Sequence, residues 1–235
     1  MLRDPVRLVR IEAARSLADV APTSLAANDR AALEHAYAEL LASEQSLADM
    51  PATQMNLANL AGRRGDSGAQ EAGYRRAMAM DPYFAPAYLA LASLLSSQHK
   101  NTDAEAMLRQ GLKRLPNDGE LHQSLGLLLA EEKRDAEGIA ELRKASELMP
   151  AQARVLYNLG LLQQSRGQLY PAEEALAKAR ALGDREATYA LALLYVREKR
   201  VDRALPLFEE LVAANPGNAQ LVQMRDQLRA ASVHK

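Results

Sequence analysis

Small and apolar residues recur along the chain at fixed positions of a period of about 34 residues. Pro82, Pro116, Pro150 and Pro216 follow one another at one, one and two such periods. When the chain is divided at this period, the seventh residue of every segment is leucine and the eighth is alanine or glycine. The pattern predicts stacked helix pairs, because each pair has an apolar face that only a neighbouring pair can bury. The segments begin at Pro51, Ala85, Gly119, Ala153 and Arg185.

Three further positions of the period hold side chains of a characteristic size. The twentieth and twenty-seventh residues are small and the twenty-fourth is large, as expected where helices cross closely and bulk fills the space between pairs. Two segments depart from this pattern, with Gln70 at a twentieth position and Leu211 at a twenty-seventh. The small residues are Ala104, Gly138, Ala172, Ala204, Ala77, Gly111, Ala145 and Ala179, and the large ones are Tyr74, Leu108, Leu142, Leu176 and Phe208.

These positions resemble the tetratricopeptide repeat, which carries small residues at its eighth, twentieth and twenty-seventh positions and a proline near its thirty-second. The resemblance covers about residues 51 to 216. It implies an all-α fold, a right-handed α-solenoid of stacked antiparallel helix pairs. The fourth repeat ends without proline, and we expect Gly183 to stop its second helix with a left-handed residue. The predicted repeats are 51–84, 85–118, 119–152, 153–184 and 185–217.

Residues 1–50 predict two helices of another kind. The first is similar to the second half of a HEAT-type repeat, with Asp4 as its N-cap and Pro5 at the first helical position. Because only half of such a unit is present, a truncated boundary is expected here. Asn28 or Asp29 is expected to cap the second helix. Its apolar residues at helical spacing are Leu33, Tyr37, Leu40, Leu41 and Leu47.

Residues 218–235 predict a capping helix that begins after Asn218 as its N-cap. Leu221, Met224 and Leu228 form one stripe of that helix, and glutamine and arginine occupy its other positions. A solenoid needs such an end, because its last pair would otherwise expose an apolar face.

A HEAT-like helix followed by tetratricopeptide repeats is similar to the C-terminal region of bacterial multihaem cytochrome c family proteins. That resemblance implies a periplasmic scaffold attached to, or descended from, an electron-transfer protein. The Cys-x-x-Cys-His motif that attaches haem in that family is absent, since the chain has no cysteine. No haem site therefore carries over to this chain, and we expect no cofactor.

Composition argues against several other functions. The net charge of −1 provides no basic field for nucleic acid. Apolar runs such as 127–129 fall far short of the roughly 20 residues of a membrane helix. The histidines are dispersed without zinc-ligand spacing, and charge runs such as 131–134 and 197–200 are interpreted as solvated faces. No phosphate-binding glycine loop or nucleophile elbow is present, so we predict a protein that is not an enzyme and holds no metal. The histidines are His35, His99, His122 and His234.

The resemblance also implies a binding groove along the first helix of each repeat. Tyr157 and Tyr189, at equivalent fifth positions, are the favoured contact residues, because tyrosine offers apolar area and a polar tip together. Chaperone C-terminal carboxylate tails are disfavoured, since Met55 and Glu120 stand where the family's clamp needs lysine. The predicted groove residues are Met55, Asn56, Asn59, Arg63, Leu89, Ser93, Gln123, Leu127, Arg154, Tyr157, Asn158, Leu161, Tyr189, Leu193 and Arg197.

The sequence therefore predicts a non-catalytic scaffold that binds a protein, as a peptide or partner helix, in this groove. For the leucines of the groove, the alternative to contacting a ligand is a structural role, in which they pack within the helix layer. Two other functions stay open: a docking module of a periplasmic cytochrome-type protein, and a scaffold for bacterial envelope or export assembly. Self-association through the groove or an end also stays open, and both cytoplasm and periplasm fit a chain without cysteine.

Overall fold

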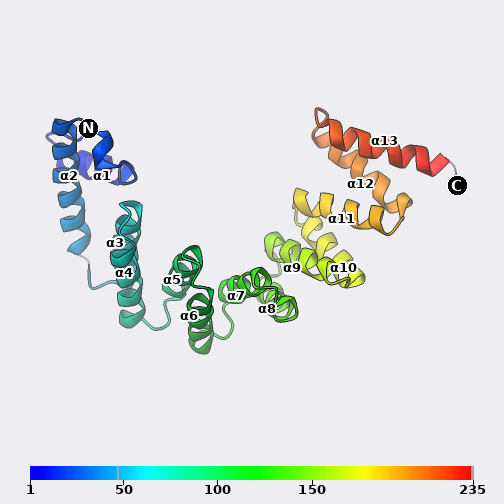
Figure 1. Ribbon diagram of the computed structural model, residues 1–235, viewed down its shortest axis with the longest axis horizontal. Coiled ribbons are helices and arrows are strands. Elements are labelled where there is room, and N and C mark those ends of the chain that lie inside the picture. The colour runs from blue at the N-terminus through cyan, green and yellow to red at the C-terminus, as the bar shows by residue number, and fades with distance from the viewer. Residues whose placement is uncertain (47, 234–235) are drawn as a thin grey trace. The chain divides into compact units, whose positions relative to one another are not determined.

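The computed structural model describes residues 1–46 and 48–233, so Leu47 and His234 lie outside the described residues. All regular elements in this part of the chain are helical, and the fold is an all-α helical-repeat solenoid (Figure 1). The first two helices are α1 (Arg7–Ser16) and α2 (Ala27–Gln45), with a 3₁₀ turn, η1 (Pro22–Ser24), between them.

Five helix pairs and a final single helix follow α2. Their first helices begin at the residues where the periodic segments of the sequence begin. The pairs are α3 (Pro51–Arg63) with α4 (Ser67–Met80), α5 (Ala85–Ser97) with α6 (Asn101–Arg114), α7 (Gly119–Glu131) with α8 (Asp135–Leu148), α9 (Ala153–Ser165) with α10 (Leu169–Ala181), and α11 (Arg185–Arg197) with α12 (Val201–Ala214). The final helix is α13 (Ala219–Val233).

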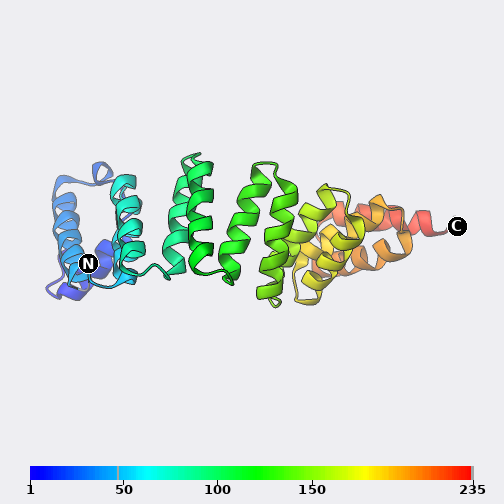
Figure 2. The same ribbon diagram turned by 90° about the horizontal axis from the view of Figure 1, so that it is seen from below.

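The chain divides into two compact units, Met1–Pro116 and Asn117–Lys235. The first unit holds α1 to α6 and the second holds α7 to α13. Within each unit the two helices of a pair run side by side and contact the next pair (Figure 2). The boundary falls in the turn between α6 and α7, inside the predicted array of repeats.

Glycines let the two helices of a pair approach closely. A Cβ atom added to Gly126 of α7 would lie 2.8 Å from Leu142 Cγ and 3.1 Å from the backbone oxygen of Gly138 on α8. In the next pair, a Cβ on Gly160 would lie 2.7 Å from Leu176 Cγ. All three distances are shorter than van der Waals contact, so the small eighth position and the large twenty-fourth position pack against each other.

The departure at Gln70 is compensated on the partner helix. A Cβ added to Gly62 of α3 would lie 2.4 Å from Gln70 Cδ, so the glycine of α3 makes the room that a small residue on α4 provides in the other pairs. The Gln70 amide donates a hydrogen bond of 3.0 Å to the Tyr74 hydroxyl, and that hydroxyl donates one of 2.6 Å to Asn59 Oδ1. The polar side chain is therefore held by partners within the pair.

Left-handed residues end several helices. Gly183 has a φ of 90°, which confirms its predicted role as the stop of α10. Gly65 and Gly167 have φ values of 81° and 72° in the turns inside their pairs. His99 lies in the corresponding turn between α5 and α6, with a φ of 60°.

The predicted start of α1 is wrong by two residues. The helix begins at Arg7, because the Asp4 carboxylate accepts a hydrogen bond of 2.9 Å from the Val6 backbone N–H and so forms a turn ahead of the helix. The expected caps of α2 are also wrong, since Ala26 is its N-cap and gives no side-chain hydrogen bond. The helices α1 and α2 pack through one apolar cluster, in which Ile11 of α1 and Leu33 of α2 are buried together.

The C-terminal helix α13 begins directly after Asn218. The Asn218 side-chain oxygen accepts hydrogen bonds from the backbone N–H groups of Gln220, at 3.1 Å, and Leu221, at 3.2 Å. Leu221 and Leu228 are buried in the same core cluster as Phe208 of α12. The helix α13 therefore covers the apolar face that α11 and α12 would expose.

We predict that Gly126→Ala destabilises the protein by about 1–3 kcal/mol, because the new methyl group would collide with Leu142 and with the backbone at Gly138. Gly68→Ala is the control, since nothing lies closer than 3.6 Å to its added Cβ. The control is expected to stabilise by about 0.4–1 kcal/mol through the entropy of the unfolded chain. Urea unfolding measures both effects, and equal midpoints for the two variants would refute the close-approach argument.

Candidate functional site

A hollow of about 690 Å³ opens in the second unit between α9, α11 and the start of α13. This volume lies within the range typical of ligand pockets. The first helices of two successive pairs form one wall, and α13 occupies the place of the next first helix. The lining residues are Tyr157, Leu161, Gln164, Arg185, Glu186, Tyr189, Ala190, Leu193, Leu211, Asn215, Asn218, Gln220 and Leu221.

The floor of the hollow is aromatic and aliphatic. It is formed by Tyr157 and Leu161 of α9, which lie one helical turn apart, and by Tyr189 and Leu193 of α11, which have the same spacing. All four side chains are only partly buried. The Tyr189 ring meets Phe208 edge to face, with ring centroids 6.3 Å apart and an interplanar angle of 83°. This contact holds Tyr189 against the core while the rest of its surface faces the hollow.

The second departure from the repeat pattern also contributes to this floor. Leu211 stands on α12 where the other pairs have a small residue, is only partly buried and lines the hollow. Together with Leu221 of α13 it extends the apolar surface beyond α11. Neither residue was among the predicted groove residues, although the misfit of Leu211 to its column was the signal that could have found it.

An ion pair crosses the rim between α9 and α11. Arg154 binds Glu186, and its guanidinium carbon lies 5.0 Å from the centre of the Tyr157 ring. Burial raises the pKa of the Tyr157 hydroxyl, and the nearby Glu186 carboxylate raises it further. The tyrosine therefore stays neutral at physiological pH, and the predicted groove cation Arg154 is already engaged by a carboxylate.

The remaining predicted residues of the second unit lie outside this hollow. Gln123 and Leu127 belong to α7, and Leu127 is 37% exposed. Asn158 is half-buried on α9, and Arg197 is exposed at the last turn of α11. The structure thus brings together four of the predicted groove residues, Tyr157, Leu161, Tyr189 and Leu193, with Arg154 beside them.

In the first unit, three of the predicted groove residues have partners within the unit. Arg63 pairs with Asp19 at 2.7 Å, and the Asn59 oxygen accepts the hydrogen bond from Tyr74. The Asn56 amide donates a hydrogen bond of 3.5 Å to Glu44 of α2. These contacts therefore use polar groups that were expected to bind a ligand in the groove. The other predicted residues of this unit are Met55, Leu89 and Ser93, and they do not line the hollow.

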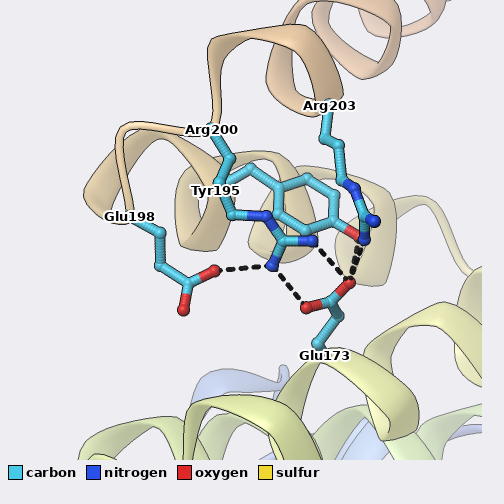
Figure 3. Close-up of polar contacts among 5 residues, drawn as sticks. All are labelled: Glu173, Tyr195, Glu198, Arg200 and Arg203. Atoms are coloured by element: carbon cyan, nitrogen blue, oxygen red, sulfur yellow. Dashed lines mark hydrogen bonds and ion pairs between the residues drawn. The ribbon is translucent and has the colours of Figure 1, made fainter.

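A polar network on another side of α11 ties that helix to α10 and α12 (Figure 3). Glu173 of α10 accepts hydrogen bonds from the Tyr195 hydroxyl at 2.8 Å and from Arg203 at 2.8 Å. Arg200 donates to both Glu173 oxygens, at 2.6 and 3.2 Å, and also to Glu198 at 2.9 Å. The guanidinium of Arg200 lies 4.6 Å from the centre of the Tyr195 ring.

This network corrects the interpretation of residues 197–200 as a solvated charge run. The side chains of Glu173 and Arg200 are only 17% and 27% exposed. The hydrogen bond from Arg200 holds the pKa of Glu173 below its ordinary value, against the opposing effect of burial. The same bond raises the pKa of Arg200. Together with the Tyr195 hydrogen bond, the ion pair therefore ties the end of α11, which carries Tyr189 and Leu193 on another face, to α10.

In the described part of the chain, no group of three or more histidine, cysteine, aspartate or glutamate residues could hold a metal ion. His122 does meet a carboxylate, Glu141 of α8, at 2.6 Å, a contact that the spacing of histidines in the sequence did not predict. None of the described helices is long and apolar enough to cross a membrane.

Comparison with known proteins gives one family. Two sequence models of the family described as tetratricopeptide repeat match residues 71–128 and 151–219, together more than half of the chain. No curated protein sequence matches the chain.

Several solved structures share this fold. MamA of Desulfovibrio magneticus RS-1, from residue 41 to its end, is 20% identical with a TM-score of 0.61, over 72% of this chain and 97% of that one. PilF of Pseudomonas aeruginosa is 22% identical with a TM-score of 0.62, over 80% and 90%. YrrB, described as a TPR protein with an unusual peptide-binding site, is 18% identical with a TM-score of 0.61, over 79% and 97%.

We predict that Glu173→Gln destabilises the protein by about 1–3 kcal/mol at neutral pH, because Arg200 and Arg203 lose their charged partner. The pKa of Glu173 is lower in the folded chain than in the unfolded one, so its contribution is complete above the unfolded value of about 4.3 and is lost as the pH falls through the folded value. The stability difference between the parent and Glu173→Gln should therefore shrink in urea unfolding below about pH 4. A difference that stays constant from pH 7 to pH 3 would contradict the role of the charge.

Proposed function

Because this chain belongs to the tetratricopeptide repeat family, we propose that it is a non-catalytic protein-interaction scaffold and that the hollow between α9, α11 and α13 binds a peptide or a partner helix. One observation carries the proposal. Tyr157, Leu161, Tyr189 and Leu193 come from two repeats and meet on the floor of one hollow. Partly exposed tyrosine side chains are typical anchors for a protein partner, and apolar side chains such as leucine are typical of the lining of a concave site.

The comparison with solved structures supports binding of a peptide in particular. YrrB, which shares the fold, is described as having a peptide-binding site. We extend this kind of ligand to the present chain as part of the proposal. The proposal also keeps five repeats over residues 51–217, with Gln123 of α7, Asn158 of α9 and Arg197 of α11 as further contact residues.

The packing of the hollow disfavours a purely structural role for its leucines. Leu161 and Leu193 are only partly buried, whereas the core leucines Leu159 and Leu191 of the same helices are 5% and 3% exposed. Leaving apolar surface in a concave site costs free energy that a bound apolar side chain would recover. The docking function in a cytochrome-type protein and the envelope or export scaffold stay predictions.

We predict that Tyr157→Ala weakens the binding of peptides selected on the intact protein from a displayed peptide library by at least about tenfold, the order of effect of a binding hot spot. Tyr157 is only partly buried and packs at the edge of the core, so we expect the variant to fold, as circular dichroism would check. Tyr170→Ala is the matched control, because Tyr170 lies outside the hollow on α10 and is 85% exposed. Fluorescence anisotropy measures the affinities, and equal losses for both variants would refute the proposed site.

A further inference from the structure

A buried glutamine of the second unit lacks a hydrogen bond that its burial calls for. Gln163 of α9 is 3% exposed, and its side-chain oxygen accepts no hydrogen bond from the described part of the chain. By contrast, the buried side chain of Gln54 on α3 is satisfied at both ends. Its amide donates to the Ala48 carbonyl at 2.6 Å, and its oxygen accepts from Arg76 at 3.0 Å. A buried acceptor without a donor costs free energy and therefore calls for an explanation.

Helix packing does not require a glutamine at this position. Gln163 is the eleventh residue of its repeat, and the same position of the two preceding repeats holds Leu95 and Leu129. Those leucines are 2% and 0% exposed, so a leucine fills this place in the core without leaving a polar atom unpaired. A polar residue that breaks a packing pattern at a cost in stability is the kind of departure expected at a functional site.

Gln163 lines a pocket of about 390 Å³ on a different face of α9 from the hollow described above. This Gln163 pocket lies between the second helices of two successive pairs, α8 and α10, with α9 behind them. Its volume is near the lower end of the range for ligand pockets, so it suits a small molecule better than a peptide or a helix. The apolar lining consists of Leu156, Leu159, Pro171 and Ala175.

The charges that line the Gln163 pocket favour an anionic ligand. Both carboxylates there are engaged by lysines of their own helices, Glu174 by Lys178 at 2.7 Å and Glu147 by Lys144 at 3.7 Å. Arg143 of α8 also lines the pocket, and no residue in the described part of the chain pairs with its guanidinium. The uncompensated charge is therefore positive, and a carboxylate is its natural partner.

We propose that the Gln163 pocket binds a small organic carboxylate that has an apolar body and an N–H or O–H donor. The donor bonds to the side-chain oxygen of Gln163, which turns toward the ligand by rotation about the last torsion of the side chain, a soft one. The carboxylate pairs with Arg143, and the apolar body packs on Leu159. A few placed polar groups over an apolar lining are typical of small-molecule sites. This site is independent of the proposed protein-binding hollow.

Three related probes separate the two polar contacts in the intact chain. Indole-3-acetate has a ring N–H, an apolar ring and a carboxylate. 1-Methylindole-3-acetate lacks the N–H donor, and indole-3-acetamide lacks the charge. NMR titration that follows the side-chain amide signals of Gln163 measures the three affinities.

The proposal expects saturable shifts of the Gln163 signals with indole-3-acetate, and about tenfold weaker binding of each of the other two probes, the effect of one hydrogen bond. If indole-3-acetate gives no saturable shift at Gln163, the inference is wrong, and a water molecule suffices as the partner of the buried oxygen. Equal affinities of indole-3-acetate and its N-methyl derivative would also overturn it.

Two variants assign the contacts to their residues. Gln163→Leu should no longer prefer indole-3-acetate over its N-methyl derivative, and should unfold at a higher urea concentration than the parent, since it leaves no unpaired acceptor. Arg143→Gln, at an exposed position of α8, should no longer prefer the carboxylate over the acetamide. The control is Gln110→Leu, an exposed glutamine of α6 in the other unit, which should keep both preferences. A tenfold preference that survives in the matching variant would overturn the inference, and Arg143→Gln decides it even if Gln163→Leu fails to fold.

Discussion

The close approach of the two helices within each pair is the constraint on which the rest of the structure depends. Gly126 and Gly160 let α7 and α9 come within contact of Leu142 and Leu176 on their partners, and no bulkier residue fits there. This contact fixes which face of each first helix turns toward its partner. Tyr157 and Leu161 are thereby left on another face of α9, where they line the hollow with the equivalent residues of α11.

Helix α11 shows how one element serves three surfaces. Leu191 and Ala192 pack in the core, Tyr189 and Leu193 face the hollow, and Tyr195 turns to the ionic network around Glu173. That network ties α11 to α10 and to the start of α12. Its residues lie outside the hollow, so they support the floor of the hollow without contacting a ligand there. The site is therefore built on packed helices, which position side chains more precisely than loops do.

Sequence positions predicted the helix pairs and the two tyrosines, since both follow from a repeating packing pattern. Other features depend on residues distant in sequence. Gln70 fits its pair because Gly62 makes room on the other helix, and Arg200 reaches Glu173 across 27 residues, so a local charge run gave no sign of the pair. Leu221 of α13 was missed as a lining residue because that helix lies outside the repeats. Asp4 failed as a cap because its carboxylate forms a turn instead.

The central claim is that the hollow between α9, α11 and α13 is the surface that binds a partner. Its most direct test is a methyl NMR spectrum of leucine-labelled protein during titration with a library-selected peptide. The account predicts shifts for Leu161, Leu193, Leu211 and Leu221, which line the hollow, and none for Leu8, which is 65% exposed on α1 in the other unit. Shifts confined to Leu8 and its neighbours, with the four hollow leucines unchanged, would contradict it.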